Sequence, residues 1–115
     1  MRYRVIFHLG EGNKARPGFT LGSMTSLLTG LTSETLDIEL VANAGGIAAF
    51  LRHNNPHARQ VRRLATQGVR FCLCASSMRQ HRLTRETFLP EVEMVSSGTD
   101  ELVEKQALGW VYISL

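Results

Sequence analysis

The alternation of hydrophobic and polar residues predicts five short strands. Residues 2–9 repeat with the two-residue period of a strand and stop at Gly10, where a polar loop begins. Residues 36–43 form a short apolar run that ends in a glycine-containing turn, as expected for a strand buried on both faces. Three further strands are predicted at residues 69–74, 91–95 and 110–115.

The segments between these strands predict helices. After a polar loop through Pro17, apolar residues from Phe19 onward recur at the spacing of one helix face. Ser97, three residues before Asp100, forms a capping-box pattern that starts the last helix, and Gly109 ends it. The four predicted helices that precede it cover residues 19–31, 46–52, 57–67 and 75–81.

Strands that alternate with helices indicate an α/β fold. We expect a single three-layer α/β/α domain over residues 1–115, with a mainly parallel five-stranded sheet that helices cover on both faces. A chain of 115 residues can form such a core without a metal or a disulfide. No internal repeat, linker or low-complexity segment interrupts the pattern.

Composition is that of an ordinary globular protein, with 43% hydrophobic and 20% charged residues. No apolar run approaches the roughly 18 residues that would span a bilayer, and the N-terminal residues enter a strand pattern rather than a signal peptide. We therefore expect a cytoplasmic protein with no membrane partner.

Positive charge is concentrated in the middle of the chain. Residues 52–85 contain eight arginines and three histidines without an acid, whereas residues 86–115 contain six acids and one lysine. The basic region could attract phosphates, an acidic partner or a sulfur-bearing anion. It could equally be a solvated face that the acidic end balances in the fold or in an oligomer.

The two cysteines, Cys72 and Cys74, lie two residues apart on a predicted strand. At about 3.3 Å per residue they are about 6.6 Å apart, which is too far for an unstrained disulfide, so both are expected as thiols. Cys72 falls within the strand and is expected in the core, whereas Cys74 falls at the end of the strand.

All strands of a parallel sheet end on one edge, where such folds usually bind ligands. Four loops are predicted to meet at that edge, at residues 10–17, 43–46, 74–77 and 96–99. Three of them carry small residues and lead into a helix N-terminus, which favours an anion or a thiolate. The candidate pocket residues are Asn43, Gly45, Gly46, Ala75, Ser76, Ser77, Arg79, Ser96, Ser97 and Gly98.

Cys74 is the candidate reactive group of this edge. A thiolate at a helix N-terminus with arginines nearby in the sequence has a lowered pKa and becomes a better nucleophile. The alternative is that Cys74 only packs, because cysteine is among the most buried residue types. No base can be assigned to it from the sequence, and no complete catalytic constellation is visible, so whether the protein is an enzyme stays open.

Other motifs predict neither a cofactor nor a metal. No glycine-rich nucleotide fingerprint or phosphate loop follows a strand. His53 and His57 are four residues apart, but Asn54, Asn55 and Pro56 break the helix that would direct both at one ion.

Three segments of the sequence together resemble one family. "VANAGGIAAFL", "GVRFCLCASSM" and "SSGTDELVEKQALGWVYISL" are similar, in order and spacing, to motifs of the DsrE/DsrF-like proteins. The resemblance implies a DsrEFH-like three-layer α/β fold that assembles as trimers or hexamers. It also implies sulfur carried as a persulfide on a cysteine, and the matching position is Cys74. Ala44 stands where the family usually has a glycine.

Our leading hypothesis is a sulfur-carrier or sulfur-relay protein that holds a persulfide on Cys74 within a homo-oligomer, with a protein sulfur donor and a protein acceptor. The alternative is an oligomeric scaffold or small-anion-binding protein in which Cys74 is structural. Nucleic-acid binding through the eight arginines is the least favoured hypothesis.

Overall fold

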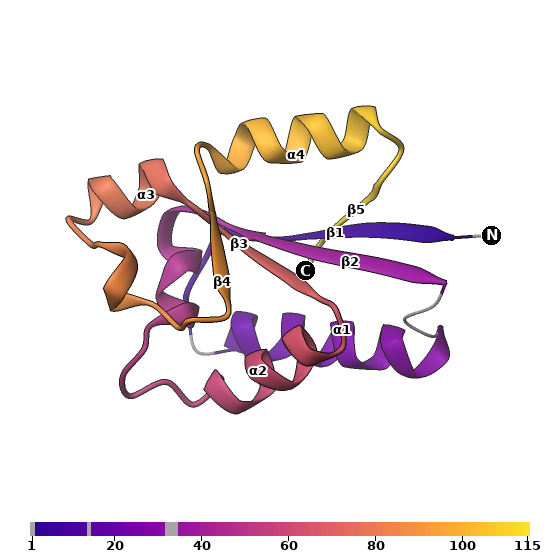
Figure 1. Ribbon diagram of the computed structural model, residues 1–115, viewed down its shortest axis with the longest axis horizontal. Coiled ribbons are helices and arrows are strands. Elements are labelled where there is room, and N and C mark those ends of the chain that lie inside the picture. The colour runs from indigo at the N-terminus through magenta and orange to yellow at the C-terminus, as the bar shows by residue number, and fades with distance from the viewer. Residues whose placement is uncertain (1, 14, 32–34) are drawn as a thin grey trace.

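The computed structural model describes residues 2–13, 15–31 and 35–115. Its strands form one five-stranded sheet, in the order β4-β3-β2-β1-β5, in which every neighbouring pair is parallel (Figure 1). The expected α/β fold is therefore confirmed, and the sheet is wholly parallel rather than mainly so. The strands are β1 (Tyr3–Leu9), β2 (Leu36–Ala42), β3 (Arg70–Cys74), β4 (Val92–Val95) and β5 (Val111–Ser114).

Helices follow the first four strands. They are α1 (Ala15–Gly30), the 3-10 helix η1 (Ala44–Phe50), α2 (Ala58–Thr66), α3 (Ala75–Gln80), the 3-10 helix η2 (Arg85–Thr87) and α4 (Gly98–Ala107). Within the residues that the structure describes, no helix is long and apolar enough to cross a membrane.

Two of the predicted helix boundaries were wrong. α1 begins inside the stretch predicted to be a loop, because Pro17 fits the first turn of a helix and the Asn13 side chain accepts a hydrogen bond from the Arg16 N–H at 3.0 Å. η1 begins at Ala44, before the predicted residue 46, because the Gly46 N–H already bonds the Asn43 carbonyl at 2.8 Å. η2 has three residues, too few for a periodic pattern to reveal.

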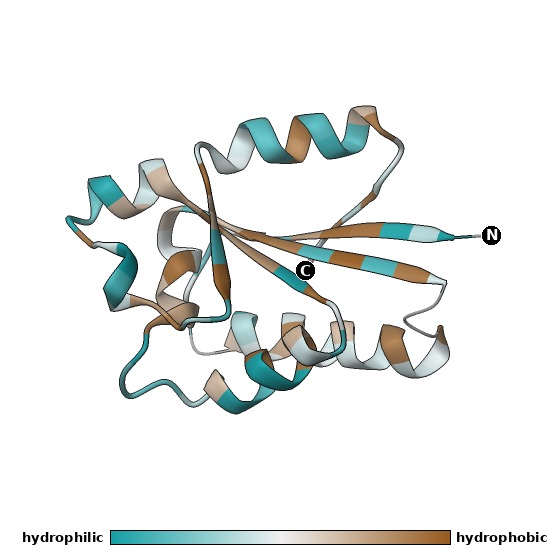
Figure 2. Ribbon diagram, in the orientation of Figure 1, coloured by the Kyte–Doolittle hydropathy of each residue, from teal (hydrophilic) through white to brown (hydrophobic). Residues whose placement is uncertain are grey.

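The sheet separates two apolar layers of unequal size. On one face, α1 and α2 pack over the larger core, to which Phe7, Leu40 and Phe71 contribute fully buried side chains. On the other face, α4 lies over a small cluster of Ile6, Val41, Cys72 and Leu102 (Figure 1). Figure 2 shows that hydrophobic residues gather in the central strands whereas α4 is largely hydrophilic.

The connections after β3 and β4 leave towards opposite faces of the sheet. The chain after β3 places Phe88 and Leu89 in the larger core, on the side of α1 and α2, whereas the chain after β4 forms α4 on the other side. The carboxyl ends of two neighbouring strands thus open onto diverging connections, which is where parallel α/β sheets bind ligands. Cys74 is the last residue of β3 and lies at this point.

The turn after β2 lies against the end of β1 with no room for a side chain at Gly46. A Cβ atom built on Gly46 would overlap the Leu9 carbonyl oxygen and lie 2.7 Å from its carbon. Both partners are backbone atoms, so no side-chain rotation can relieve the overlap. Gly46 therefore lets the loop that carries Asn43 lie directly on the sheet edge.

The Gly46→Ala variant is expected to unfold at lower denaturant concentration, with a loss of about 1–3 kcal/mol, because the β1 and β2 ends must move apart. Gly22→Ala is the matched control: a Cβ there meets nothing within 4 Å, and alanine favours the helix by up to about 1 kcal/mol. Urea unfolding of both variants checks this, and equal stability of Gly46→Ala and the parent protein would contradict the close contact.

Candidate functional site

Cys74 lies at the junction of β3 and α3 with its sulfur turned back towards the backbone. Its side chain is the N-cap of α3, and Sγ accepts a hydrogen bond from the Ser77 N–H at 3.4 Å. The residue is 5% exposed, so the thiol is covered in this conformation. Cys74 therefore combines a position at the ligand edge with near-complete burial.

Hydrogen-bond donors surround the Cys74 sulfur. Burial acts to raise the pKa of the thiol, but the Ser77 hydroxyl and the backbone N–H groups of Gly98, Ser77 and Ser76 act against it, and the net pKa lies below the ordinary value. Donors of this kind stabilise the charged form of a group. They come from the first turns of α3 and α4, so two helices that diverge from the sheet both present N–H groups to one sulfur.

Cys72 has the opposite environment. It is fully buried in the small cluster under α4, and burial raises the pKa of its thiol to about 12, with the negative charge of Glu39 acting in the same direction. Both cysteines are free thiols, as the strand geometry predicted. Cys72 is part of the core, as the sequence indicated.

Three loops meet at Cys74. The Ala44 N–H donates to the Ser77 hydroxyl oxygen at 2.8 Å, which joins the loop after β2 to the start of α3. A Cβ added to Gly98 would lie 3.1 Å from the Asn43 Cβ, so the start of α4 also lies against the loop after β2. The structure thus brings together Asn43, Ser77 and Gly98 from the predicted pocket.

Ala44 adopts a backbone conformation that glycine enters more easily, which explains why the family usually has a glycine at this position. Its φ is +47°, in the left-handed region that alanine enters at a cost of about 1–2 kcal/mol. The loop keeps this conformation, and its N–H still reaches Ser77. Ala44 therefore carries strain that a glycine at this position would avoid.

Two other residues of the predicted pocket, Ser97 and Arg79, have positions that the structure makes clear. Ser97 is the N-cap of α4, and its hydroxyl oxygen accepts the Asp100 N–H at 3.4 Å, as the capping pattern predicted. Arg79 is exposed, and the groups that chiefly lower the pKa of Cys74 are N–H and O–H donors rather than arginines. A ligand role for these residues and for Gly45, Gly46, Ala75 and Ser96 stays a prediction.

A histidine lies beside the loop after β2. His8 is within hydrogen-bond distance of two side chains, with Nε2 2.9 Å from the Asn43 Oδ1 and Nδ1 2.8 Å from the Tyr112 hydroxyl. The ring therefore fixes the orientation of the Asn43 amide. The sequence alone did not assign this partnership, because it joins residues of β1, β5 and the loop after β2, which are far apart in the sequence.

A cavity of about 400 Å³ lies near this edge, on the side of α1. Gly12, Asn13, Asn54 and His57 contribute to its lining, and Cys74 does not. The cavity is therefore a separate feature from the thiol environment.

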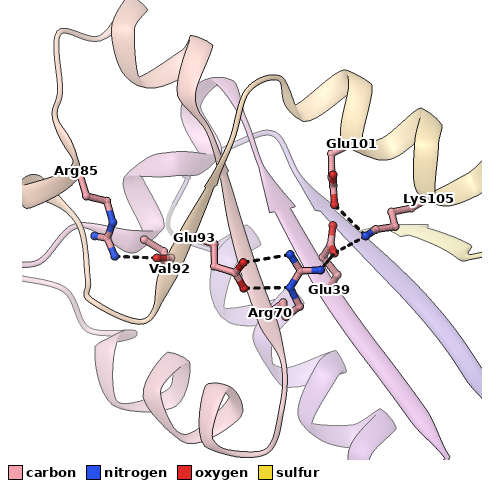
Figure 3. A network of polar contacts seen from close by, with 7 residues as sticks. All are labelled: Glu39, Arg70, Arg85, Val92, Glu93, Glu101 and Lys105. Carbon is pink, nitrogen blue, oxygen red and sulfur yellow. Dashed lines mark hydrogen bonds and ion pairs between the residues drawn. The ribbon is translucent and has the colours of Figure 1, made fainter.

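Sequence reasoning missed a buried charge network beneath α4 (Figure 3). Glu39 on β2 is fully buried, with Oε1 3.0 Å from Arg70 Nη1 and 3.4 Å from Lys105 Nζ. Lys105 also lies 3.3 Å from Glu101. The available signal was a charged residue in the middle of the apolar run of residues 36–43.

Four of the eight central arginines have partners among the residues that the structure describes. Arg62 and Arg70 pair with carboxylates, and Arg52 and Arg85 donate to backbone carbonyls, among them that of Val92 at 2.8 Å (Figure 3). Some of the carboxylates come from β4 and the turn before it, which belong to the acidic end of the chain. The basic and acidic regions of the sequence are thus linked within the fold by Arg62 and Arg70.

Comparison with known proteins identifies the family. The DsrE/DsrF-like family matches residues 1–115, the whole chain. This protein belongs to the DsrE/DsrF-like family. The membership confirms the resemblance carried by the three sequence segments. None of the proteins with curated functions matches the chain.

Two solved structures are similar to this DsrE/DsrF-like chain. MTH1491 from Methanobacterium thermoautotrophicum, a protein of unknown function, has 34% identity and a TM-score of 0.92, covering 98% of this chain and 99% of that one. The YchN protein of E. coli has 18% identity and a TM-score of 0.78 over the whole of both chains, which shows a shared fold.

The Ser77→Ala variant is expected to raise the pKa of Cys74, because it removes the hydroxyl that stabilises the thiolate. It also leaves the Ala44 N–H without its partner, at a cost of about 1 kcal/mol in stability. The pH dependence of Cys74 alkylation by iodoacetamide, followed by mass spectrometry, measures the shift.

Ser76→Ala serves as the control for this measurement, because Ser76 acts on the thiol through its backbone N–H, which the substitution retains. An unchanged alkylation profile in Ser77→Ala would contradict the assigned hydrogen bond.

Proposed function

We propose that this protein is a cytoplasmic sulfur carrier that holds a persulfide on Cys74 and passes its outer sulfur to a protein acceptor. The observation that supports the proposal most strongly is the set of donors around the sulfur, which lowers the pKa of Cys74 although the residue is buried. Membership of the DsrE/DsrF-like family, with Cys74 at the position that the resemblance marks, supports it independently.

The transfer consists of two displacements at sulfur. The Cys74 thiolate attacks the outer sulfur of a donor persulfide, forms the Cys74 S–S bond, and releases the donor as its thiolate. An acceptor thiolate then attacks the outer sulfur of Cys74-S-SH, and Cys74 leaves again as a thiolate. A stabilised Cys74 thiolate favours both steps, because it is the nucleophile in the first and the leaving group in the second.

The neighbouring groups suit the leaving thiolate. The N–H groups of Ser76, Ser77 and Gly98 can donate to the sulfur anion as the S–S bond breaks. The Ser76 and Ser77 donors belong to the first turn of α3, which positions them for the developing charge before the step begins. The chain thus supplies the stabilisation of charge, and donor and acceptor proteins supply the reacting sulfur atoms.

Incubation of the protein with a polysulfide or a persulfide-loaded cysteine desulfurase should add one sulfur, about 32 Da, to the intact mass, as the transfer above requires. Cys74→Ser should show no addition. Cys72→Ala, the matched control, should load like the parent protein, because Cys72 is buried as a neutral thiol.

The location of the added sulfur is checked by peptide mapping after alkylation of the persulfide. Equal loading of Cys74→Ser and the parent protein would contradict the proposed carrier role. Absence of loading from every donor in a folded parent protein would contradict it as well.

A second candidate function is an oligomeric scaffold or small-anion-binding protein with a structural cysteine. The observation that favours it is the capping of α3 by Cys74, whose sulfur accepts the Ser77 N–H while the residue is only 5% exposed. A serine could cap the same helix, so a purely structural role predicts that Cys74→Ser folds normally and that the parent protein takes up no sulfur.

Assembly as a homo-oligomer, a trimer or a hexamer, belongs to the same proposal. Phe19 on α1 is 66% exposed, and Val111 and Tyr112 on the edge strand β5 are 55% and 41% exposed. Large apolar side chains at such exposure favour contact with another chain. Size-exclusion chromatography with light scattering is expected to give three or six copies, and a monomer at micromolar concentration would contradict this part of the proposal.

A further inference from the structure

The charge network beneath α4 contains an unusual group. Glu39 has no exposed surface and lies in the middle of the sheet, next to the apolar cluster that α4 covers. Its Oε1 accepts from Arg70 and Lys105, whereas its Oε2 is buried and has no hydrogen-bond partner among the described residues (Figure 3). A buried carboxylate oxygen without a partner is costly, so the site must hold something that satisfies it.

The carboxyl groups of this network outnumber its positively charged side chains. Within the described part of the chain, Glu39, Glu93 and Glu101 are linked to two cations, Arg70 and Lys105. One negative charge is therefore in excess when all three carboxyl groups are ionised. A single bound cation or a single proton would neutralise the network.

A metal ion fits this site poorly. Glu39, Cys72 and Glu101 present oxygen and sulfur atoms that all lie within 4.8 Å of one another. The Lys105 ammonium, however, already lies 3.4 Å from Glu39 and 3.3 Å from Glu101, so a second cation would be repelled there. The missing charge is more simply supplied by a proton shared between the two carboxyl groups.

The remaining neighbours of Glu39 do not supply this proton. From β1, the residue in register with Glu39 is Ile6, which does not titrate. Arg4, two residues earlier on β1, donates to the Leu108 carbonyl at 2.8 Å. From β3, the Cys72 thiol has its pKa raised to about 12 by burial and so stays neutral.

α4 depends on this network for its attachment to the sheet. Gly98 and Leu102 are its only buried residues, so the helix has a single large apolar side chain in the core. Glu101 and Lys105, which face Glu39, provide its other links to the strands below. The first residue of α4, Gly98, lies next to Cys74, and its backbone N–H acts to lower the pKa of the thiol.

We propose that Glu39 and Glu101 share one proton, and that this proton latches α4 over Cys74. Release of the proton leaves two carboxylates facing each other with one lysine between them, α4 moves away from the sheet, and Cys74 becomes accessible. The proposal rests on Cys74 as the reacting group of the proposed function, and not on the identity of the group that it carries.

The direction of the pH effect follows from the carboxyl group. Burial raises the pKa of Glu39 to about 7, and both the hydrogen bond to Glu101 and the negative charge of Glu101 act in the same direction. The positive charges of Lys105 and Arg70 act to lower the pKa of Glu39, but they are outweighed. The partner Glu101 has its pKa lowered, chiefly by the hydrogen bond with Glu39, so the proton lies on Glu39. The stability that this proton provides is complete below pH 4.5 and is lost as the pH rises through about 7.

The test is the rate of Cys74 alkylation by excess iodoacetamide between pH 5.5 and pH 9, in the parent protein and in Glu39→Gln. Glutamine imitates the protonated carboxyl group and keeps the latch closed. The ratio of the parent rate to the variant rate should therefore rise through pH 7, by at most about tenfold per pH unit, because one proton is released.

Glu104→Gln is the matched control, since Glu104 lies on the exposed side of α4. Its ratio to the parent rate should stay constant with pH. If Glu39→Gln does not fold, Glu101→Gln removes the other half of the pair and should show the same pH-dependent ratio. Carbon-13 NMR of labelled glutamate side chains should show one carboxyl group that titrates near pH 7 in the parent protein.

A constant ratio for Glu39→Gln at all pH values, or the absence of a glutamate that titrates near pH 7, would overturn the latch. Because iodoacetamide reports access to Cys74 directly, this result is independent of persulfide loading. A working latch without persulfide loading would count against the carrier function alone.

Discussion

The contact between the Cys74 sulfur and the backbone N–H groups of two helices is the interaction on which the chemistry of this fold depends. It exists because β3 and β4 are neighbours and parallel, while the connections that follow them leave towards opposite faces. The first turns of α3 and α4 therefore meet at the end of one strand. The donors that lower the pKa of Cys74 are backbone groups of this meeting point, together with the Ser77 hydroxyl.

The two faces of the sheet divide stability from function. α1 and α2 close the larger core with apolar side chains. α4 covers the other face with a single buried leucine and relies on Glu39, Glu101 and Lys105 for much of its attachment. A helix held in this way can move at lower cost than one held by a large apolar surface, as the proposed latch over Cys74 requires.

Much of this structure could be predicted from the sequence, and the failures have physical reasons. The period of apolar residues gave all five strands and the α/β class, and strand geometry separated the core Cys72 from the edge Cys74. The start of α1 was misplaced because Pro17 reads as a loop residue but is compatible with a first turn. The Glu39 network was missed because its members are up to 66 positions apart, although a glutamate in an apolar strand was the clue. The arginines were assigned too much influence on Cys74, since Arg79 is exposed and the groups that chiefly lower the pKa of the thiol are N–H and O–H donors.

The central claim is that the hydrogen-bond donors around Cys74 lower the pKa of its thiol below that of an ordinary cysteine. Thiolate absorbance at 240 nm, measured against pH in the folded protein and in Cys74→Ser, isolates the titration of this single group. The account predicts a difference curve with a pKa below that of an unperturbed cysteine, about 8.5. A difference curve centred at or above that value would contradict it.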